Sequence, residues 1–295
     1  MSPILRALGG WRFAKRAAYL AALALAGAAL VHPVAVRTER GIDYLVVFDV
    51  SLSMATEDYR VDGIPTSRLD VAKTAFRRVV RDLPPHARIT LAGFAGNTVQ
   101  VFLTRQPVRD LEAIEAALAV LEWDNIWDVG SRLDLVMRDV VAQAEGSTVF
   151  RQTGRRPILP RELNVVFFTD GGGEDVRHSI GADATAWLTR HARVAFIGLG
   201  QPQPSPVPQF TRARPRDCLR DAVDGGCLTS SLNELNLQKL AEWLGGRYEP
   251  LRDVDRLREI FLDEPLTGEE ARVPHEVGWI LGLASLGFFL VWVLL

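Results

Sequence analysis

The sequence predicts an α/β protein built on a doubly wound, mostly parallel six-stranded sheet with one antiparallel edge strand, flanked by two transmembrane helices. Strand-like and helix-like patterns alternate in the middle of the chain, and both terminal regions hold long uncharged stretches. The 295 residues carry a formal net charge of −2, and 48% of them are hydrophobic. This composition suits one sizeable globular domain plus hydrophobic segments. Since no long basic run occurs, the sequence lacks the charge pattern of a nucleic-acid-binding protein.

The N-terminal region predicts a first membrane span. Residues 1–16 contain four basic and no acidic side chains, and residues 17–36 are uncharged. Twenty such residues are enough to cross a bilayer as a helix. A cleavable signal peptide is the alternative, because Ala26, Gly27 and Ala28 offer small residues after an apolar region. The basic flank predicts a cytoplasmic N-terminus, with the following domain on the other side of the membrane.

The C-terminal region predicts a second membrane span over residues 277–295. This stretch is uncharged, and Trp279 and Trp292 lie near its two ends. Aromatic residues at both ends are typical of a helix whose termini reach the membrane interfaces. The chain between the two spans is therefore expected to form the globular domain.

The first strand of that domain delivers a polar loop. Residues 44–50 are mostly apolar, as in a buried parallel strand, and the run ends in Asp49-x-Ser51-x-Ser53. Along an extended loop these three side chains point to the same side, so that a carboxylate and two hydroxyls could converge on a hard cation. An ordinary turn followed by a helix N-cap is the alternative interpretation.

A helix and a hairpin are expected next. Residues 56–63 are polar without a sustained period, and Ser67 to Asp70 have the form of a helix start. Residues 88–94 and 99–103 are predicted strands, and Gly96-Asn97 between them indicates a hairpin with an antiparallel edge strand. The first helix repeats its apolar face at Leu69, Ala72, Phe76, Val79 and Leu83 and is expected to end at Pro84-Pro85.

The second half continues the alternation. Residues 163–168 form another apolar strand, which ends in Thr169-Asp170-Gly171. Because ligands bind beyond the carboxyl ends of parallel strands, Asp49 and Asp170 are expected at one edge of the sheet. The remaining predictions are helices over residues 111–121, 133–144, 182–191 and 235–244, a strand over residues 193–199 and a short strand near Tyr248.

These motifs resemble the metal-ion-dependent adhesion site of von Willebrand factor A domains, which are Rossmann-like and bind partner proteins through one divalent cation. The resemblance covers residues 42–262, within a domain expected over residues 41–265. It implies that a single Mg²⁺ or Ca²⁺ is bound and that a partner protein supplies a carboxylate to it. The family usually has Thr where this chain has Ser131; Asp128 is a substitute candidate, or the N-cap of the next helix. The implied metal ligands are Asp49, Ser51, Ser53, Ser131 and, usually through water, Asp170.

A closer resemblance rests on the residues after the first motif. Glu57-Asp58-Tyr59 and Ser67-Arg68-Leu69, together with the flanking spans, look like bacterial membrane-anchored A-domain proteins of the aerotolerance type. They also resemble A-domain accessory proteins encoded in methanol-oxidation operons. This resemblance implies a protein of the bacterial inner membrane with its A domain in the periplasm. It also implies an accessory or maturation role for a periplasmic enzyme complex, association with chaperone-like ATPases of the MoxR class, and hetero-complexes with other A-domain proteins.

The sequence gives little support to an enzyme. A haloacid-dehalogenase phosphatase would need a second Asp where this chain has Ser51, so its general acid would be missing. Residues 171–173 are three glycines without the spacing and Lys of a phosphate-binding loop, and no H-E-x-x-H or G-x-S-x-G occurs. A structural envelope assembly module with a vacant metal site is the alternative function.

A long insert is predicted over residues 201–231, on the same edge as the metal loops. Loops of this length are usually functional or disordered. Cys218 and Cys227 are the only cysteines, and in an oxidising compartment they are expected to form a disulfide; free thiols are the alternative. Four basic side chains could border a partner-binding face or be solvated surface charges: Arg212, Arg214, Arg216 and Arg220.

Overall fold

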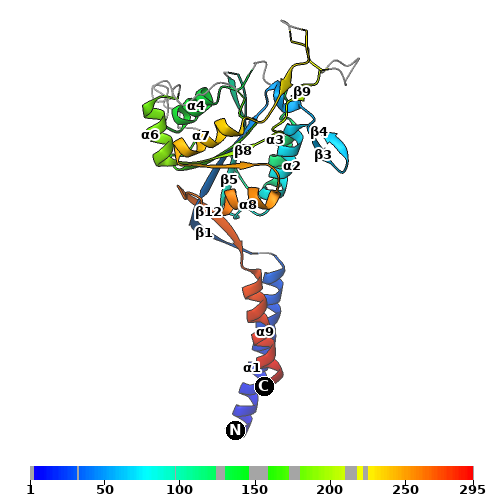
Figure 1. Cartoon of the computed structure of the whole chain (residues 1–295). Helices are drawn as coiled ribbons and strands as arrows, with labels where there is room; N and C mark the ends of the chain where they lie inside the picture. The colour runs from blue at the N-terminus through cyan, green and yellow to red at the C-terminus, as the bar shows by residue number, and fades with distance from the viewer. Residues whose placement is uncertain are drawn as a thin grey trace. The chain divides into compact units, whose positions relative to one another are not determined.

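The computed structural model describes residues 3–31, 33–96, 98–123, 130–145, 159–172, 180–209, 218–221 and 225–294. It contains two compact units: residues 40–270 form one, and residues 1–39 with 271–295 form the other (Figure 1). Some residues singled out in the sequence lie outside the described part of the chain: Asn97, Asp128, Gly173, Arg212, Arg214 and Arg216.

A six-stranded sheet is the centre of the unit formed by residues 40–270. The strand order is β11-β8-β7-β2-β5-β6, and every neighbouring pair is parallel except β5 and β6. The predicted mostly parallel sheet with one antiparallel edge strand is therefore confirmed. The strands are β2 (Ile42–Asp49), β5 (Ala87–Ala95), β6 (Thr98–Pro107), β7 (Leu163–Thr169), β8 (Ala192–Gly198) and β11 (Arg247–Pro250).

Both faces of the sheet are covered by helices, because the side chains of a strand alternate between two faces. In β2, Tyr44, Val46 and Phe48 pack in one core, while Leu45 and Val47 pack in the other. The first core is completed by α2 (Arg68–Val80), α3 (Leu111–Ala119) and α8 (Val254–Leu262), and the second by α4 (Leu133–Glu145), α6 (Ala182–His191) and α7 (Glu234–Leu244) (Figure 1).

The order of the strands locates a ligand-binding edge. The chain runs from β2 to β5 on one side and later returns to β7 on the other side of β2. Such a reversal opens a crevice beyond the carboxyl ends of the two strands. Asp49 ends β2 and Asp170 directly follows β7, so both carboxylates lie at this point of the sheet.

Helix α2 begins where the sequence indicates. The Ser67 hydroxyl accepts a hydrogen bond from the Asp70 backbone N–H at 3.1 Å, which caps the first turn. The predicted apolar positions from Leu69 to Leu83 are buried. The helix ends at Val80, before the expected stop at Pro84. The second predicted helix likewise ends early, at Ala119.

Several short elements escape prediction. Where a polar stretch without a period was expected, β3 (Tyr59–Val61) and β4 (Ile64–Thr66) form an antiparallel hairpin. Strands of three residues are too short to show a periodic pattern. The other unpredicted elements are η1 (Leu52–Ala55), α8, the pair β9 (Ser205–Pro206) and β10 (Thr229–Ser230), and the pair β1 (Val34–Arg40) and β12 (Glu270–Glu276).

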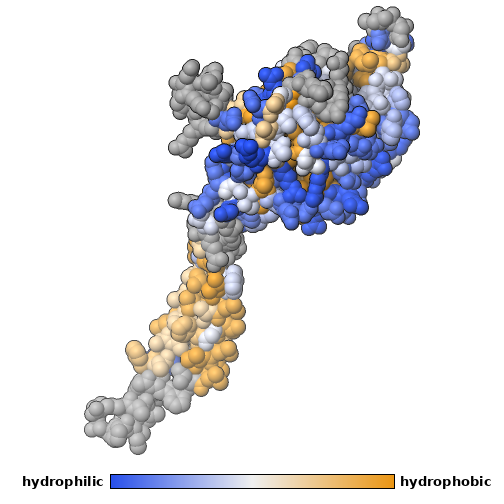
Figure 2. All heavy atoms as spheres, turned by 60° about the vertical axis from the view of Figure 1, so that its left-hand side comes forward, coloured by the Kyte–Doolittle hydropathy of each residue, from blue (hydrophilic) through white to orange (hydrophobic). Residues whose placement is uncertain are grey.

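Two apolar helices lie side by side in the unit of the terminal regions, α1 (Pro3–Leu30) and α9 (Gly278–Leu294) (Figure 1). The Ser285 hydroxyl donates to the Ala22 carbonyl at 2.8 Å, and the rings of Tyr19 and Trp292 are 5.4 Å apart. Figure 2 shows that the surface of these helices is mostly hydrophobic.

One helix in the described part of the chain is long and apolar enough to cross a membrane. This segment is Phe13–Leu30, and α9 is a shorter apolar helix. The first span was predicted over residues 17–36, whereas α1 ends at Leu30 and β1 begins at Val34. Pro33 lacks a backbone N–H, and a branched residue follows it, which favours leaving the helix there.

Candidate metal centre

Asp49 is the centre of the polar cluster at the carboxyl edge of the sheet. Its side chain is fully buried and accepts three hydrogen bonds. The Ser51 backbone N–H donates to Oδ1 at 2.9 Å, while the hydroxyls of Ser131 and Thr169 donate to Oδ2 at 2.8 and 2.7 Å. Three separate segments of the chain, two loops and the end of β7, therefore orient this one carboxylate.

Three serine hydroxyls gather beside it. The Ser51 Oγ lies 3.1 Å from the Ser53 Oγ and 3.1 Å from the Ser131 Oγ. The short helix η1 turns the chain directly after Ser51 and thereby holds the first two serines together. The third serine is held at the end of β5, where the Gly96 N–H donates to the Gly130 carbonyl and the Gly96 carbonyl accepts from the Arg132 N–H.

The loop after β7 presents Asp170 next to this cluster. The Gly172 N–H donates to Asp170 Oδ1 at 2.9 Å, and the backbone carbonyl of Asp170 accepts from the Asn233 N–H at 2.8 Å. Gly171 has a φ of +69°, and a Cβ at that position would lie 2.7 Å from Leu237. Glycine therefore allows both the left-handed turn and the close packing against α7.

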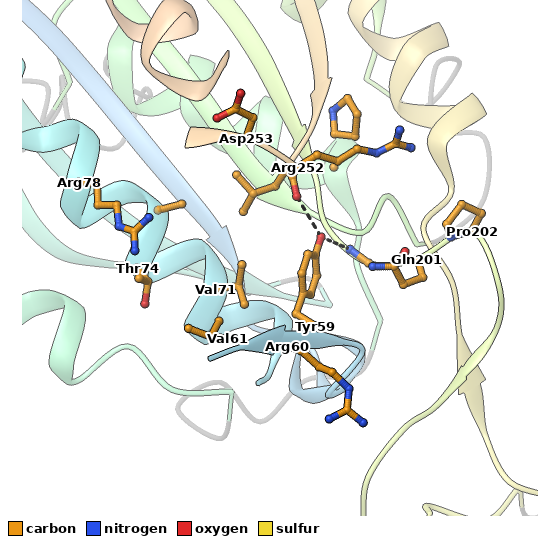
Figure 3. A pocket seen from close by; sticks show the side chains of 15 residues that line it. Tyr59, Arg60, Val61, Val71, Thr74, Arg78, Gln201, Pro202, Arg252 and Asp253 are labelled. Atoms are coloured by element: carbon orange, nitrogen blue, oxygen red, sulfur yellow. Dashed lines mark hydrogen bonds between the residues drawn. The ribbon is translucent and has the colours of Figure 1, made fainter. Parts of the chain in front are cut away.

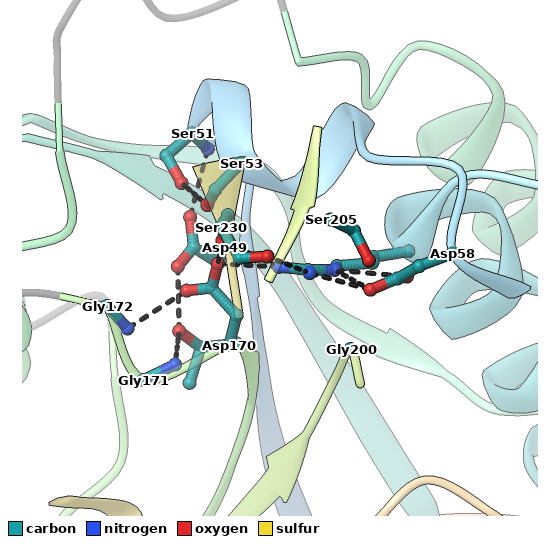
Figure 4. Close-up of polar contacts among 12 residues, drawn as sticks. Asp49, Ser51, Ser53, Asp58, Asp170, Gly171, Gly172, Gly200, Ser205 and Ser230 are labelled. Atoms are coloured by element: carbon teal, nitrogen blue, oxygen red, sulfur yellow. Dashed lines mark hydrogen bonds and ion pairs between the residues drawn. The ribbon is translucent and has the colours of Figure 1, made fainter. Parts of the chain in front are cut away.

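A buried arginine binds the other oxygen of Asp170. Arg68, the first residue of α2, has a fully buried side chain whose Nη1 lies 3.0 Å from Asp170 Oδ2. On its other side the guanidinium binds Asp58, with Nη2 2.6 Å from Oδ2 and Nε 3.1 Å from Oδ1. The Ser230 hydroxyl accepts from Arg68 at 2.8 Å and donates to Asp170 at 3.0 Å. We call Asp58, Arg68, Asp170 and Ser230 the arginine cluster (Figure 4).

The two carboxylates at the sheet edge differ in their electrostatic surroundings. Burial raises the pKa of Asp49 to about 6, and the negative charge of Asp170 contributes to the increase. Hydrogen bonds from Ser51 and Thr169 oppose this effect on the pKa without reversing it. Asp170, in contrast, has the Arg68 guanidinium against it. Asp49 is therefore the carboxylate that a bound cation would stabilise most.

The oxygen atoms around Asp49 fit a hard divalent cation. Mg²⁺ prefers six oxygen ligands in octahedral geometry at roughly 2.0–2.1 Å, which puts adjacent ligand oxygens about 3 Å apart. The oxygens of Asp49, Ser51, Ser53 and Ser131 are separated by 2.8 to 3.1 Å along the hydrogen bonds that link them. Carboxylate and hydroxyl oxygens are also the ligand types suited to Mg²⁺ or Ca²⁺. In the part of the chain that the structure describes, no group of three or more His, Cys, Asp or Glu side chains could hold a metal.

The insert over residues 201–231 reaches this edge at both of its ends. The Gln201 backbone N–H donates to Asp58 Oδ2 at 3.1 Å, and Ser230 belongs to the arginine cluster. Between these ends, Cys218 and Cys227 form a disulfide, with Cα atoms 5.5 Å apart. The exposed Arg220 donates to the Gly225 carbonyl and lines a hollow with residues of the loop after β2.

The structure brings the predicted ligands Asp49, Ser51, Ser53 and Ser131 into one hydrogen-bonded group and places Asp170 beside it in the arginine cluster. Sequence reasoning missed the contributions of Asp58, Thr169 and Ser230 and the burial of Arg68. One signal for Arg68 was present: it lies four residues before Ala72, on the apolar face of α2. No sequence pattern links residues 68 and 170, which come together only in the folded chain.

A separate cavity of about 420 Å³ lies beside the β3–β4 hairpin (Figure 3). Tyr59 forms part of its wall, and its hydroxyl accepts from the Gly200 N–H at 3.0 Å. None of the five predicted metal ligands lines this cavity. Its lining combines apolar side chains with three arginines: Tyr59, Val61, Val71 and Leu251 with Arg60, Arg78 and Arg252.

Comparisons with known proteins give a consistent result. Residues 44–172 match the family model described as von Willebrand factor type A domain. A solved structure of an aerotolerance-related membrane protein from Bacteroides fragilis, with multiple mutations to serines, is similar at 21% identity and a TM-score of 0.56, covering 76% of this chain and 98% of that chain. The conserved hypothetical protein BatB from Bacteroides thetaiotaomicron is similar at 21% identity and a TM-score of 0.56, with coverages of 75% and 97%. None of the curated proteins compared with the sequence matches it. The two structural likenesses show a shared fold.

Proposed function

We propose that this protein is a membrane-anchored module that binds a partner protein through a divalent cation, because residues 44–172 match the family model of the von Willebrand factor type A domain. Domains of this family mediate protein–protein interactions and often bind a divalent metal at an adhesion site. The observation that carries the proposal is the group of four oxygen-bearing side chains around Asp49, whose oxygens are 2.8 to 3.1 Å apart along its hydrogen bonds.

In this proposal Asp49, Ser51, Ser53 and Ser131 hold the cation, Mg²⁺ or Ca²⁺, and Asp170 supports it from beside the site. When bound, the cation supplies a positive charge that a carboxylate of the partner can coordinate. The chain's own residues orient the ligands and keep the Asp49 carboxylate buried. The proposed role of the site is to bind a cation and a partner protein, with no catalytic step.

The proposed setting is the bacterial inner membrane, with the A domain in the periplasm. The apolar segment Phe13–Leu30 and the basic residues before it support this orientation. The resemblance of residues 57–59 and 67–69 to membrane-anchored A-domain proteins of the aerotolerance type is the basis for an accessory or maturation role for a periplasmic enzyme complex, acting with a chaperone-like ATPase of the MoxR class. Methanol oxidation is one such pathway, and other A-domain proteins are candidate partners.

The test is a calorimetric titration of the full chain in detergent with Mg²⁺ and with Ca²⁺. We expect one binding site in the wild-type protein and none in Asp49→Asn, because the amide keeps the shape of the carboxylate but removes its charge. The matched control is Asp43→Asn, since Asp43 is a buried carboxylate at the opposite end of the same strand, paired with Arg88 and Arg105. Its metal binding should equal that of the wild type.

Partner binding provides the second half of the test. A partner that co-purifies with the wild-type chain should be released by EDTA, retained by Asp43→Asn and absent from Asp49→Asn. Equal Mg²⁺ affinity in a folded Asp49→Asn protein would refute the metal assignment. Metal binding without any cation-dependent partner would instead refute the interaction role.

A further inference from the structure

Both oxygens of the second carboxylate at the sheet edge accept hydrogen bonds, Oδ2 from the arginine cluster and Oδ1 from the loop after β7. Asp170 Oδ2 accepts from Arg68 and Ser230, and Asp170 Oδ1 accepts from the Gly172 N–H. Its side chain is 1% exposed, and that of Arg68 is 0% exposed. A cation that coordinated Asp170 directly would therefore have to displace buried, charge-assisted hydrogen bonds.

The surroundings fix Arg68 in this position. Asp58, whose side chain is 3% exposed, binds the guanidinium from the opposite side, and the Ser230 carbonyl accepts from Nη2 at 3.1 Å. Gly200 has a φ of +111°, and a Cβ there would lie 2.7 Å from the guanidinium carbon. The guanidinium is thus enclosed by hydrogen-bond acceptors and by backbone, and these contacts fix the conformation of the Arg68 side chain.

We propose that Arg68 is a positioning residue that keeps Asp170 from coordinating the cation directly, so that Asp49 is the only charged protein ligand. This inference rests on the proposed metal site. One carboxylate and three hydroxyls bind a divalent cation weakly, because ligand charge largely sets affinity. Binding becomes strong when the partner adds a second carboxylate, which makes cation and partner binding mutually dependent.

The decisive variant is the double substitution Asp58→Asn and Arg68→Met. It removes two buried opposite charges together, which proteins often tolerate. Arg68→Met alone would leave the carboxylates of Asp58 and Asp170 without the guanidinium that pairs with them. In the double variant the Asp170 carboxylate is released from its guanidinium. Calorimetric titration of the full chain in detergent should then show Mg²⁺ binding about tenfold tighter than in the wild type. Adding Asp170→Asn to the double variant should abolish this gain.

A matched control separates this effect from the general loss of a buried ion pair. Asp43→Asn with Arg88→Met removes a buried carboxylate and its arginine, 2.5 Å apart, from the other end of the sheet. Its Mg²⁺ affinity should equal that of the wild type. A purely structural role for Arg68 predicts unchanged or weaker Mg²⁺ binding in the folded double variant, and that result would overturn the inference.

A measurement on the wild-type protein tests the inference independently of any variant. In crystals soaked with Mn²⁺, anomalous scattering locates the cation, and the Asp170 carboxylate should still contact Arg68 and lie outside the coordination sphere. Direct coordination of Mn²⁺ by Asp170 would overturn the inference and leave the metal site itself intact. Absence of Mg²⁺ binding in both the wild type and the double variant would overturn the inference together with the proposed function.

Discussion

Asp49 ends β2 and Asp170 directly follows the neighbouring strand β7, yet their chemical surroundings differ. Asp49 accepts hydrogen bonds from two hydroxyls and a backbone N–H, and burial raises its pKa. Asp170 is held by a buried guanidinium that also binds Asp58. An ion pair of this kind contributes little net stability, but loss of one member leaves an uncompensated buried charge. The hydrogen-bonded carboxylate of Asp49 and the ion-paired carboxylate of Asp170 are thus suited to different tasks at one edge of the sheet.

Gly200 provides a test of the packing around Arg68. Substitution by Ala should destabilise the domain by about 2 kcal/mol, because the left-handed backbone is strained and the methyl group would meet the guanidinium. Thermal unfolding of the full chain in detergent, followed by near-ultraviolet circular dichroism, measures the change. The Mg²⁺ affinity of the variant should also differ from that of the wild type, because the Arg68 side chain has to shift.

Gly245 is the matched control for this prediction. It also has a positive φ, of +64°, but a Cβ there would meet nothing within 4 Å. Gly245→Ala should cost only about 1 kcal/mol and leave the Mg²⁺ affinity unchanged. Equal losses of stability in the two variants would show that backbone strain alone accounts for the effect at Gly200.

At the level of single residues, the sequence indicates ligands more readily than the groups that hold them. The motif Asp49-x-Ser51-x-Ser53 is local, and its spacing alone suggests convergence on a cation. The arginine cluster joins residues 58, 68, 170 and 230, which are distant in the chain. Such contacts depend on the complete strand order and on loop conformations, neither of which leaves a local pattern.

At the level of elements, the insert is attached to the domain at both ends and is cross-linked within itself. Gln201 binds Asp58 at its start, Ser230 enters the arginine cluster at its end, and Cys218 and Cys227 form a disulfide between them. Long surface loops normally lose much conformational entropy when they are ordered. A cross-link reduces that loss by restricting the unfolded chain.

The disulfide leads to a prediction about the compartment. Thiol labelling of protein taken from the cell envelope, under denaturing and non-reducing conditions, should find both cysteines blocked until a reductant is added. Replacing both by Ser should cost roughly 2–3 kcal/mol at most, since the loop between them is short. Two freely reactive thiols in the native protein would contradict both the oxidised pair and the periplasmic placement.

Most elements with a clear apolar pattern were predicted from the sequence, and most of the others were not. Strands β2 and β7 are continuous apolar runs, and helices α2, α4, α6 and α7 each present a periodic apolar face. The β3–β4 hairpin has only three residues per strand. Its formation depends on its packing in the folded domain more than on an alternating apolar pattern in its sequence. Helix α8 is polar on its outer side and comes after β11, the last strand of the six-stranded sheet, where only the end of the domain was expected.

At the level of the whole molecule, the two terminal helices are the proposed membrane anchor. A helix of 17 residues such as α9 is near the lower limit for crossing a bilayer, so its pairing with α1 matters. The contact between Ser285 and Ala22 places a polar hydroxyl against a backbone carbonyl, an interaction that suits a lipid environment.

Reporter fusions test the orientation of the anchor. A reporter that is active only in the periplasm should be active when fused after Arg40 and inactive when fused after Leu295, because the basic N-terminal flank favours the cytoplasm. The reverse pattern would refute the proposed topology. Release of a soluble domain when residues 277–295 are removed would indicate that the first span is a cleaved signal.

The attachment of both ends of the insert to the arginine cluster has a consequence for divergence among related proteins. Gln201 and Ser230 hold the ends in place, so the residues between them can change in sequence or number without moving Asp58 or Arg68. Lengthening a loop whose ends are already fixed costs little free energy. Natural variation, or a grafted peptide, could therefore redirect the choice of partner while the cation chemistry at Asp49 stays the same.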